Sequence, residues 1–256
     1  MKRFNLFLAL IVVLGFAFTL KMDRPTLYLI GDSTVKNGDG TGKNNQMGWG
    51  TVIDAYFDTS KINIRNHAIG GRSSRTFVTE GRWQKTLASL KPGDYVIIQF
   101  GHNDSGPLDD TARARGSLRG IGEDSTEIYN PILKMQEVVH SYGWYLRQYI
   151  REARQKGATA IVCSPIPRND WKDGKVIRSN TSYALWAEQV AQEEKVSFIP
   201  LNHLVALKYE EMGMEVVKPF FPVDHTHTNM DGAKLNAAIV AGAIRALAVN
   251  LKLFLL

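Results

Sequence analysis

Short apolar runs recur along the chain, and each is followed by a loop rich in glycine and polar residues. Five of these runs are rich in aliphatic residues and show little alternation with polar positions. That pattern is typical of strands whose two faces are both covered, as in a parallel sheet. The predicted strands are residues 26–30, 62–69, 95–100, 158–165 and 196–201.

The segments between these runs carry apolar residues at helical spacing. They predict helices around Trp49–Phe57, over Trp83–Leu90, Ile128–Gln155 and Tyr183–Glu194, and after Asp231. Alternating strands and helices predict an α/β fold in which a parallel sheet of about five strands has helices on both faces. Sheets of this kind bind ligands beyond the carboxyl ends of their strands.

The N-terminal segment differs from the rest of the chain. Lys2 and Arg3 precede an uncharged apolar run over residues 6–20. This layout is typical of a secretory signal, and the run is short for a membrane span of about 20 residues. The alternatives are a buried helix and an uncleaved membrane anchor. We expect a signal peptide at 1–20, a single domain at 21–256, and a secreted or periplasmic protein.

Composition narrows the classes of function. With 256 residues and 44% hydrophobic content, the chain is long enough for one well-buried core, and no linker or repeat divides it. Cys163 is the only cysteine, which excludes an internal disulfide and a cysteine-based zinc site. The formal charge is +6, but no cluster of Lys and Arg indicates nucleic acid as a partner. Membrane contact is expected only through an uncleaved N-terminal segment.

The loop GDSTVKNGDGTGKN after the first predicted strand resembles a phosphate-binding loop in composition but not in spacing. A P-loop that ends at Gly42 and Lys43 requires glycine where Asn37 stands and a hydroxyl residue where Asn44 stands. The dinucleotide pattern G-x-G-x-x-G fails because Ser33 occupies the position of its second glycine. What remains is a serine just beyond a strand.

Three further polar loops accompany GDST at residues 31–34. GGRSSR at 70–75 and GHND at 101–104 follow the second and third predicted strands, and FPVDHTHTN at 221–229 precedes the last helix. Because parallel strands end at the same edge of a sheet, the first three loops are expected to lie together. We expect the fourth loop to join them.

These loops contain the residue types that nucleophilic catalysis requires. A serine hydroxyl reacts well when a base takes its proton and a third group orients that base. Asp224 and His227, three residues apart, are able to supply both groups for Ser33. A developing oxyanion needs preformed donors, and the Ser33 N–H, a glycine N–H of the second loop and the Asn103 amide form such a set.

The four blocks, in this order, resemble those of the SGNH (GDSL-type) hydrolases, and the match spans Gly31 to His227. GDST, AIGGRSSRTF, the insert SLRGIGEDS after GHND, and FPVDHTHTN are similar to the rhamnogalacturonan acetylesterases in particular. The resemblance implies a flavodoxin-like three-layer α/β/α fold. It also implies a serine esterase that removes acetyl groups from pectic rhamnogalacturonan without a metal or cofactor. The motif G-x-S-x-G of the α/β-hydrolases is absent.

Carried over by position, the resemblance assigns Ser33 as the nucleophile, His227 as the base and Asp224 as the partner of that base. It assigns the oxyanion hole to the Ser33 N–H, Gly71 and Asn103. Gly71 is chosen because the glycine of the family directly precedes the arginine.

Each motif also has an alternative interpretation. GDST is compatible with an ordinary turn in which Asp32 and Ser33 form local hydrogen bonds. Asn103 is compatible with a residue that only caps a helix. The cluster DHTH is compatible with a metal site. The metal ligands would be His102, Asp224, His225 and His227. We prefer the serine hydrolase hypothesis because it also explains Ser33 and Asn103.

Five residues are candidate substrate contacts. Trp171, in the loop after the fourth predicted strand, is a sugar-stacking candidate, although tryptophan is more often part of a core. Arg72 and Arg75 are placed to face a galacturonate carboxylate or to pair with nearby acids. His102 and His225 adjoin the catalytic motifs and complete the set.

Two other functions remain open at this stage. A lipase or lysophospholipase of the same superfamily is one, but the polar and charged insert over 105–126 favours a sugar substrate. A non-catalytic carbohydrate-binding protein is the other, although binding alone does not require the Ser33, Asp224 and His227 set.

Overall fold

The computed structural model describes residues 24–256. Its centre is a sheet of five strands in the order β2-β1-β3-β6-β9, and every neighbouring pair is parallel. The strands are β1 (Thr26–Gly31), β2 (Asn63–Asn66), β3 (Tyr95–Gln99), β6 (Thr159–Cys163) and β9 (Ser197–Ile199). This confirms the predicted α/β fold and all five predicted strands.

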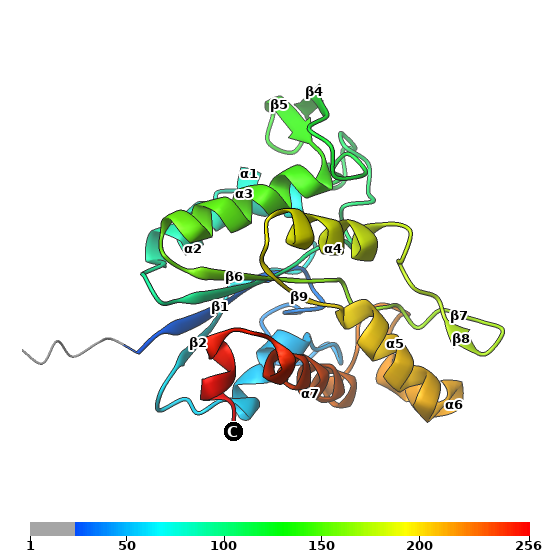
Figure 1. The fold of residues 1–256 in the computed structure, drawn as a ribbon. Helices are drawn as coiled ribbons and strands as arrows, with labels where there is room; N and C mark the ends of the chain where they lie inside the picture. Colours follow the sequence, from blue (N-terminus) through cyan, green and yellow to red (C-terminus); the bar gives the residue numbers. More distant parts are fainter. Residues whose placement is uncertain (1–23) are drawn as a thin grey trace, which may run out of the picture.

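Helices cover both faces of the sheet, which makes the molecule a three-layer α/β/α sandwich (Figure 1). One face is covered by α1 (Ser74–Thr79), α2 (Arg82–Ser89), α3 (Tyr142–Gln155) and α4 (Tyr183–Glu193). The other is covered by the 3₁₀ turns η1 (Trp49–Thr51) and η2 (Ile53–Tyr56), with α5 (Leu201–Met212) and α7 (Met230–Ala246).

The strand sequences divide between two hydrophobic cores. In β1, Leu27 and Leu29 belong to the core beneath α5 and α7, whereas Tyr28 and Ile30 belong to the core beneath α1 to α4. Successive side chains of a strand point to opposite faces, so a strand that is buried on both sides needs apolar residues at every position. This is why the strands read as continuous apolar runs.

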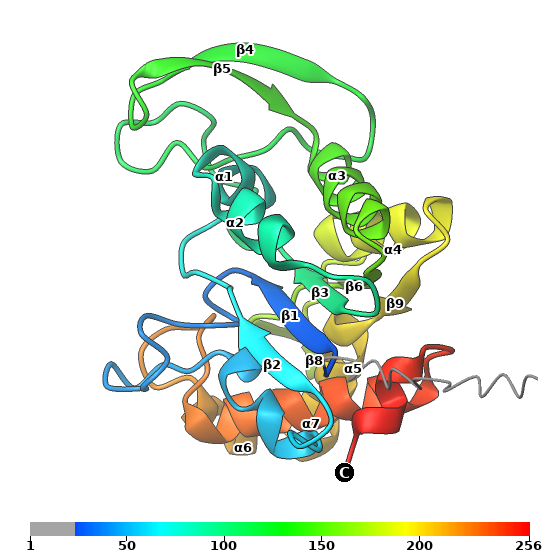
Figure 2. The ribbon, with the colours of Figure 1, turned by 90° about the vertical axis from the view of Figure 1, so that its left-hand side faces the viewer.

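A β-hairpin replaces the first half of the helix predicted over Ile128–Gln155. β4 (Ser125–Asn130) and β5 (Met135–His140) pair antiparallel, and only the second half of the segment forms α3. The hairpin arches over α1 and α3 at one end of the molecule (Figure 2). The helix prediction is therefore wrong from Ile128 to His140.

Two local signals explain this difference. The Asn130 side chain accepts hydrogen bonds from the amides of Ile132 and Leu133 at 2.9 and 3.0 Å, which turns the chain beside Pro131. The Ser141 hydroxyl accepts a hydrogen bond from an amide in the first turn of α3 and caps it. A turn and a cap inside one apolar pattern separate it into a hairpin and a helix.

The helices predicted over Trp83–Leu90, over Tyr183–Glu194 and after Asp231 are confirmed as α2, α4 and α7, whereas several other elements differ from the prediction. The helix expected around Trp49–Phe57 consists of η1 and η2, while α1 and α5 lie where no helix was expected. Trp171 lies in a small hairpin rather than in an irregular loop. The elements not yet described are β7 (Trp171–Lys172), β8 (Lys175–Val176), α6 (Met214–Val217), η3 (Lys218–Phe220) and η4 (Asn250–Phe254).

The predicted signal peptide at 1–20 lies outside the described residues. Across residues 24–256, no helix combines the length and the apolar character that a membrane span needs.

Candidate active site

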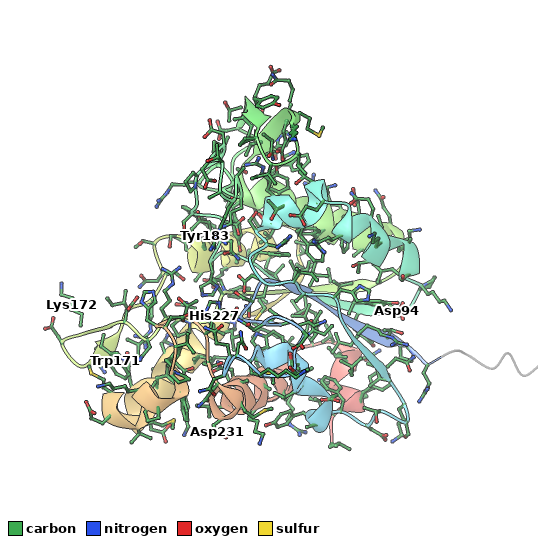
Figure 3. All side chains as sticks on the ribbon, turned by 180° about the vertical axis from the view of Figure 1, so that it is seen from behind. Asp94, Trp171, Lys172, Tyr183, His227 and Asp231 are labelled. Carbon is green, nitrogen blue, oxygen red and sulfur yellow. The ribbon has the colours of Figure 1, made fainter. Side chains whose placement is uncertain are left out.

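The four polar loops gather at the carboxyl end of the sheet. Asp94 directly precedes β3, and His227 lies well away from it, towards the other end of the sheet (Figure 3). Ser33 follows β1, and Asn103 follows β3. Ser33, Asn103 and His227 line one cavity, so the expectation that these distant loops meet is confirmed.

A continuous chain of hydrogen bonds joins three of the predicted residues. His227 Nε2 lies 2.8 Å from Ser33 Oγ, and His227 Nδ1 lies 2.7 Å from Asp224 Oδ2. With Nδ1 carrying the hydrogen, Nε2 is free to accept the proton of the serine hydroxyl. This arrangement is able to activate Ser33 as a nucleophile.

Asp224 accepts hydrogen bonds with both of its oxygens. Oδ1 accepts from the backbone amides of Thr226 and His227 at 2.7 and 2.8 Å, and Oδ2 also accepts from Gln46 Nε2 at 2.9 Å. Burial opposes ionisation, but the hydrogen bonds from His227 and the two amides outweigh it and lower the pKa of Asp224 to about 2. The carboxylate is therefore held charged and fixed in orientation.

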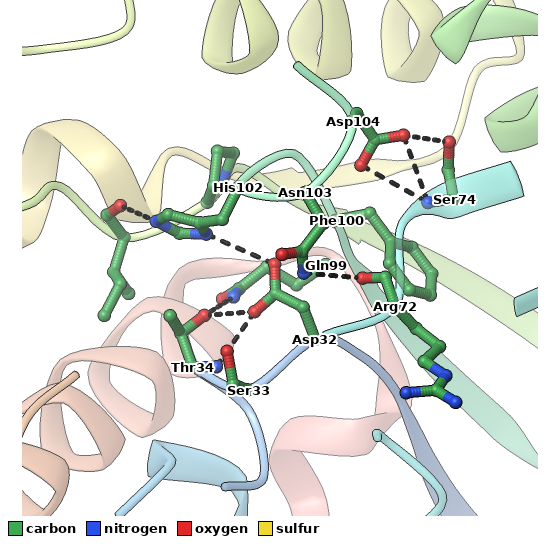
Figure 4. A network of polar contacts seen from close by, with 12 residues as sticks. Asp32, Ser33, Thr34, Arg72, Ser74, Gln99, Phe100, His102, Asn103 and Asp104 are labelled. Carbon is green, nitrogen blue, oxygen red and sulfur yellow. Dashed lines mark hydrogen bonds and ion pairs between the residues drawn. The ribbon is translucent and has the colours of Figure 1, made fainter. Parts of the chain in front are cut away.

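Buried polar contacts hold the loop that carries Ser33 (Figure 4). Asp32 accepts from the Thr34 amide and hydroxyl at 2.9 and 2.7 Å, and its second oxygen lies 3.2 Å from His102 Nδ1. Burial raises the pKa of Asp32, but the contacts with His102 and Thr34 prevail and leave it lowered. At Gly31 a Cβ would lie 2.5 Å from the Gln99 carbonyl oxygen, so only glycine allows the strands to approach here.

Gly71 and Asn103, the other expected oxyanion donors, both line this cavity. Gly71 has a φ of +78°, a backbone conformation that favours glycine. Steric crowding is not the reason for glycine here, because an added Cβ would meet no atom closer than 3.8 Å. Asn103 Nδ2 donates to the Arg72 carbonyl oxygen at 2.9 Å. That bond orients the amide and is not a helix cap.

The cavity over Ser33 and His227, the catalytic pocket, has a volume of about 580 Å³. Four arginines line it, whereas Glu80 is the single carboxylate among its described lining residues. The four are Arg72, Arg113, Arg115 and Arg168. Burial and the neighbouring Arg113 lower the pKa of Arg115. The pocket therefore suits a substrate that carries negative charge near the bond to be broken.

The two predicted arginine contacts differ in their surroundings. Arg72 lines the pocket, with Nε 2.9 Å from Glu80 Oε2. Arg75 is fully buried and forms a two-bonded ion pair with Glu137 of β5, at 2.7 and 2.5 Å. Its Nη1 also donates to the carbonyl oxygens of Leu108 and Gly116. Of the two roles expected for Arg75, the structure shows the pairing with an acid; the guanidinium has no accessible surface with which to face a substrate carboxylate.

The histidine and tryptophan contacts also need correction. His102 lies in the pocket wall, but its ring nitrogens face Asp32 and the Ile166 carbonyl oxygen, so they are occupied. His225 Nδ1 pairs with Asp170 Oδ1 at 2.7 Å, outside the pocket wall. Trp171 packs against the core below the sheet and not against the pocket. His102 therefore has no free ring nitrogen, and neither His225 nor Trp171 lines the pocket over Ser33.

These same contacts separate the residues of the alternative metal cluster. His102 and His225 turn towards different carboxylates, and in residues 24–256 no three His, Cys, Asp or Glu side chains converge as metal ligands do. DHTH instead places Asp224 and His227 in line with Ser33.

The sequence interpretation missed several residues of this site, Arg113 among them. Gln46 donates to Asp224 across 178 positions, and Arg115 and Arg168 line the pocket. Arg115 belongs to the charged insert after GHND, which was a usable signal. Gln46 and Arg168 stand in segments without a recognisable motif.

The GDSL-like Lipase/Acylhydrolase family matches residues 29–245. The rhamnogalacturonan acetylesterase of Emericella nidulans is 35% identical over 213 residues, which cover 83% of this chain and 81% of that protein. A Bacillus subtilis protein named "Probable rhamnogalacturonan acetylesterase YesY" is also 35% identical, over 88% of this chain and 94% of its own.

Solved structures agree with the fold. The crystal structure of YxiM from Bacillus subtilis superposes with a TM-score of 0.71 at 27% identity, and the shared region covers 89% of this chain and 58% of that longer one. The family match extends from β1 to α7 and includes every residue of the Ser33 site. This chain belongs to the GDSL-like lipase/acylhydrolase family.

Proposed function

We propose that this protein is a serine esterase that removes O-acetyl groups from rhamnogalacturonan, a pectic polysaccharide that contains galacturonate. The observation that carries the proposal is the hydrogen-bonded chain from Ser33 through His227 to Asp224, at 2.8 and 2.7 Å. The names of the relatives and the arginines around the catalytic pocket support the choice of substrate.

The reaction begins when Ser33 Oγ attacks the acetyl carbonyl carbon while His227 Nε2 takes the hydroxyl proton. Charge that develops on the carbonyl oxygen is stabilised by the Ser33 and Gly71 amides and by the Asn103 side chain. His227 then gives its proton to the departing sugar oxygen, which leaves an acetyl-serine. Water attacks that ester with His227 as base again, releasing acetate and restoring the serine.

The lining of the catalytic pocket favours an acetylated sugar over a lipid ester as the substrate. Apart from Ala112 and Ile132, its described walls consist of glycines and polar or charged residues. A long acyl chain needs a continuous apolar wall to leave water. A short acetyl group on a hydroxylated polymer has no such requirement.

We also propose that the protein is exported. The proposal rests on the sequence of residues 1–20 alone, a basic start followed by an uncharged apolar run. N-terminal sequencing of the protein recovered from the periplasm or the medium tests it. A start near residue 21 is expected, and retention of Met1 in the cytoplasm would contradict it.

A labelling experiment tests the catalytic proposal. A fluorophosphonate probe should label Ser33, and Ser33→Ala should abolish both labelling and acetate release from acetylated rhamnogalacturonan. Ser60→Ala is the matched control, because Ser60 is exposed in a loop before β2. EDTA should leave the rate unchanged. Labelling of another serine, or a rate lost in EDTA and restored by zinc, would contradict the mechanism.

A further inference from the structure

The glycine-rich loop after Ser33 has no part in the chemistry proposed for the catalytic pocket. It lacks the spacing of a phosphate-binding loop, and it folds into two tight turns, at residues 37–40 and 42–45. The second turn is closed by the Asn45 amide, which donates to the Gly42 carbonyl oxygen at 2.8 Å. Gly42 and Asn45 have φ of +73° and +59°, a conformation that glycine and asparagine adopt more readily than other residues. The chain leaves this turn at Gln46.

Gln46 contacts the oxygen of Asp224 that orients the base. Asp224 Oδ2 accepts from Gln46 Nε2 at 2.9 Å and lies 2.7 Å from His227 Nδ1. The other oxygen, Oδ1, accepts from two backbone amides of its own loop. Gln46 therefore supplies a donor from a distant segment, and it does so at the oxygen on which the direction of the His227 ring depends.

The Gln46 side chain is itself fixed at its other end. Asn44 Nδ2 lies 3.1 Å from Gln46 Oε1 and 2.9 Å from Asn37 Oδ1, and Asn37 lines the catalytic pocket. A carboxylate only accepts hydrogen bonds, so the amide of Gln46 has to turn its nitrogen to Asp224 and its oxygen to Asn44. Both ends of this amide are thus engaged in one orientation.

The backbone that follows Gln46 joins the two catalytic loops. The Met47 amide donates to the Thr228 carbonyl oxygen at 2.6 Å, and Thr228 Oγ1 donates to the Met47 carbonyl oxygen at 3.1 Å. Two residues later, the Trp49 amide donates to the Thr34 carbonyl oxygen at 3.0 Å. This short segment is therefore bound both to the loop of the nucleophile and to the loop of the base.

We propose that Gln46 is a positioning residue for the esterase reaction. By donating to Asp224 Oδ2, it holds the carboxylate in the orientation that aims His227 at Ser33. Gln46 is not among the residues that line the catalytic pocket, so it acts through Asp224 and not on the substrate. The glycine-rich loop then has the role of bringing this amide to the catalytic carboxylate. The proposal rests on the serine esterase mechanism proposed above.

Removal of the donor separates orientation of the base from binding of the substrate. Gln46→Met keeps the length of the side chain but is unable to donate. Because the amide bonds to Asp224 Oδ1 remain, we expect kcat for nitrophenyl acetate to fall about tenfold while KM changes less than about twofold. The rate at which a fluorophosphonate probe labels Ser33 should fall in parallel. Gln148→Met is the matched control, because Gln148 Nε2 also donates to a carboxylate, Glu152 Oε1 at 3.0 Å on α3. It should change neither rate.

A second variant makes the donor depend on pH. Gln46→Glu keeps the shape of the side chain, but the new carboxyl donates to Asp224 only while it is protonated. In the described part of the chain, His227 is the titratable side chain that already contacts Asp224, whereas His225 faces Asp170. Two carboxyl groups that share one site hold a proton between them to unusually high pH. The kcat of Gln46→Glu should therefore pass through a maximum and fall again as pH rises, where the wild type keeps its plateau. A residue that only maintains the fold would alter the melting temperature without adding this ionisation to kcat.

The outcomes separate this proposal from the one on which it rests. An unchanged kcat and labelling rate in Gln46→Met, or a pH profile of Gln46→Glu that matches the wild type, would overturn the role of Gln46 and leave the esterase proposal standing. If the probe labels Ser33 in the wild type but no acetate leaves rhamnogalacturonan, the choice of substrate fails, and the labelling rates still decide on Gln46. A wild type that the probe does not label at Ser33 would overturn both.

Discussion

Two aspartates in the motif loops experience opposite environments. Asp224 accepts hydrogen bonds from several donors, which hold its carboxylate ionised. An ionised carboxylate is what the orientation of His227 requires. Asp104 is buried and accepts hydrogen bonds only from neutral groups: the amide and hydroxyl of Ser74 and the hydroxyl of Ser117. Burial therefore prevails and raises the pKa of Asp104 to about 6. The one carboxylate supports chemistry, whereas the other joins α1 to the insert.

The raised pKa of Asp104 predicts a pH dependence of stability. Between about pH 4 and pH 6 the native protein binds this proton and the unfolded chain does not, so the free energy of unfolding falls as pH rises through this window. A shift of roughly two pKa units corresponds to about 3 kcal/mol. Asp104→Asn should remove this part of the pH dependence of stability, because asparagine does not titrate. Urea unfolding at pH 4, 5, 6 and 7 measures this pH dependence, and Asp109→Asn, at an exposed position, is the control. Equal slopes of unfolding free energy against pH in the wild type and in Asp104→Asn would contradict the prediction.

Asn103 gives a second prediction at this scale. An amide that donates to the oxyanion is needed most in the transition state, so Asn103→Ala should lower kcat far more than it raises KM. The expected loss is about 10²–10³ in rate, roughly 2.7–4 kcal/mol. Loss of the bond to the Arg72 carbonyl should cost about 1 kcal/mol of stability, a few degrees in melting temperature. A variant that keeps its kcat but melts far lower would assign Asn103 a structural role.

At the scale of elements, α1 connects the catalytic end to the insert and the β4–β5 hairpin. Arg75 of α1 binds Glu137 of β5 and carbonyl oxygens of the insert, and Glu137 also accepts from Asn130 Nδ2 at 2.6 Å. Ile132, at the tip of the hairpin, reaches the wall of the catalytic pocket. The buried Arg75–Glu137 ion pair does not line the pocket, but it thus holds the hairpin that carries Ile132 in the pocket wall.

This pair predicts an asymmetric response to substitution. Glu137→Ala leaves the Arg75 guanidinium buried without its carboxylate, which should cost about 3–5 kcal/mol of stability. Arg75→Met combined with Glu137→Leu should recover part of that loss, because an apolar pair of similar size avoids the unpaired charge, although the Leu108 and Gly116 carbonyl oxygens lose a donor. The control, Glu211→Ala in the exposed Lys208–Glu211 pair, should cost under about 1 kcal/mol. Urea unfolding of the wild type and the three variants tests this. A double variant no more stable than Glu137→Ala would contradict it.

At the scale of the whole molecule, uncompensated positive charge gathers at the end of the sheet where the loops meet. The catalytic pocket and the cavity that adjoins it at His102 and Arg168 are lined by arginines from the second loop, the insert and the segment after β6. Only part of this charge is balanced, by Glu80 beside Arg72 and by Glu210 beside Arg178. Such a concentration of charge attracts a polyanion along its length.

A dependence of KM on salt follows from this distribution. Between about 0.1 M and 1 M NaCl the Debye length falls from about 10 to about 3 Å, so KM for acetylated rhamnogalacturonan should rise several-fold. KM for the neutral nitrophenyl acetate should change little. Arg113→Gln, at an exposed position of the pocket rim, should weaken the dependence. A KM for the polymer that is insensitive to salt would contradict this account.

The sequence by itself determined the sheet and the place of its functional loops. Strands buried on both faces require continuous apolar runs, and parallel strands end at one edge, so GDST after β1 and GHND after β3 had to lie together. The same rules placed Ser33 and Asn103 at that edge. The helix expected over Ile128–His140 is a hairpin instead, since a turn and a cap outweighed the apolar spacing.

Tertiary structure alone decided which polar side chains face the pocket. Arg72 and Arg75 are three residues apart and chemically identical, yet one lines the pocket while the other is buried against Glu137, 62 positions away. Gln46 reaches Asp224 across 178 positions. Local patterns describe a few neighbouring residues, whereas the partner of a buried charge depends on the path of the whole chain. The strands were therefore predictable from the sequence, and the partners of the arginines were not.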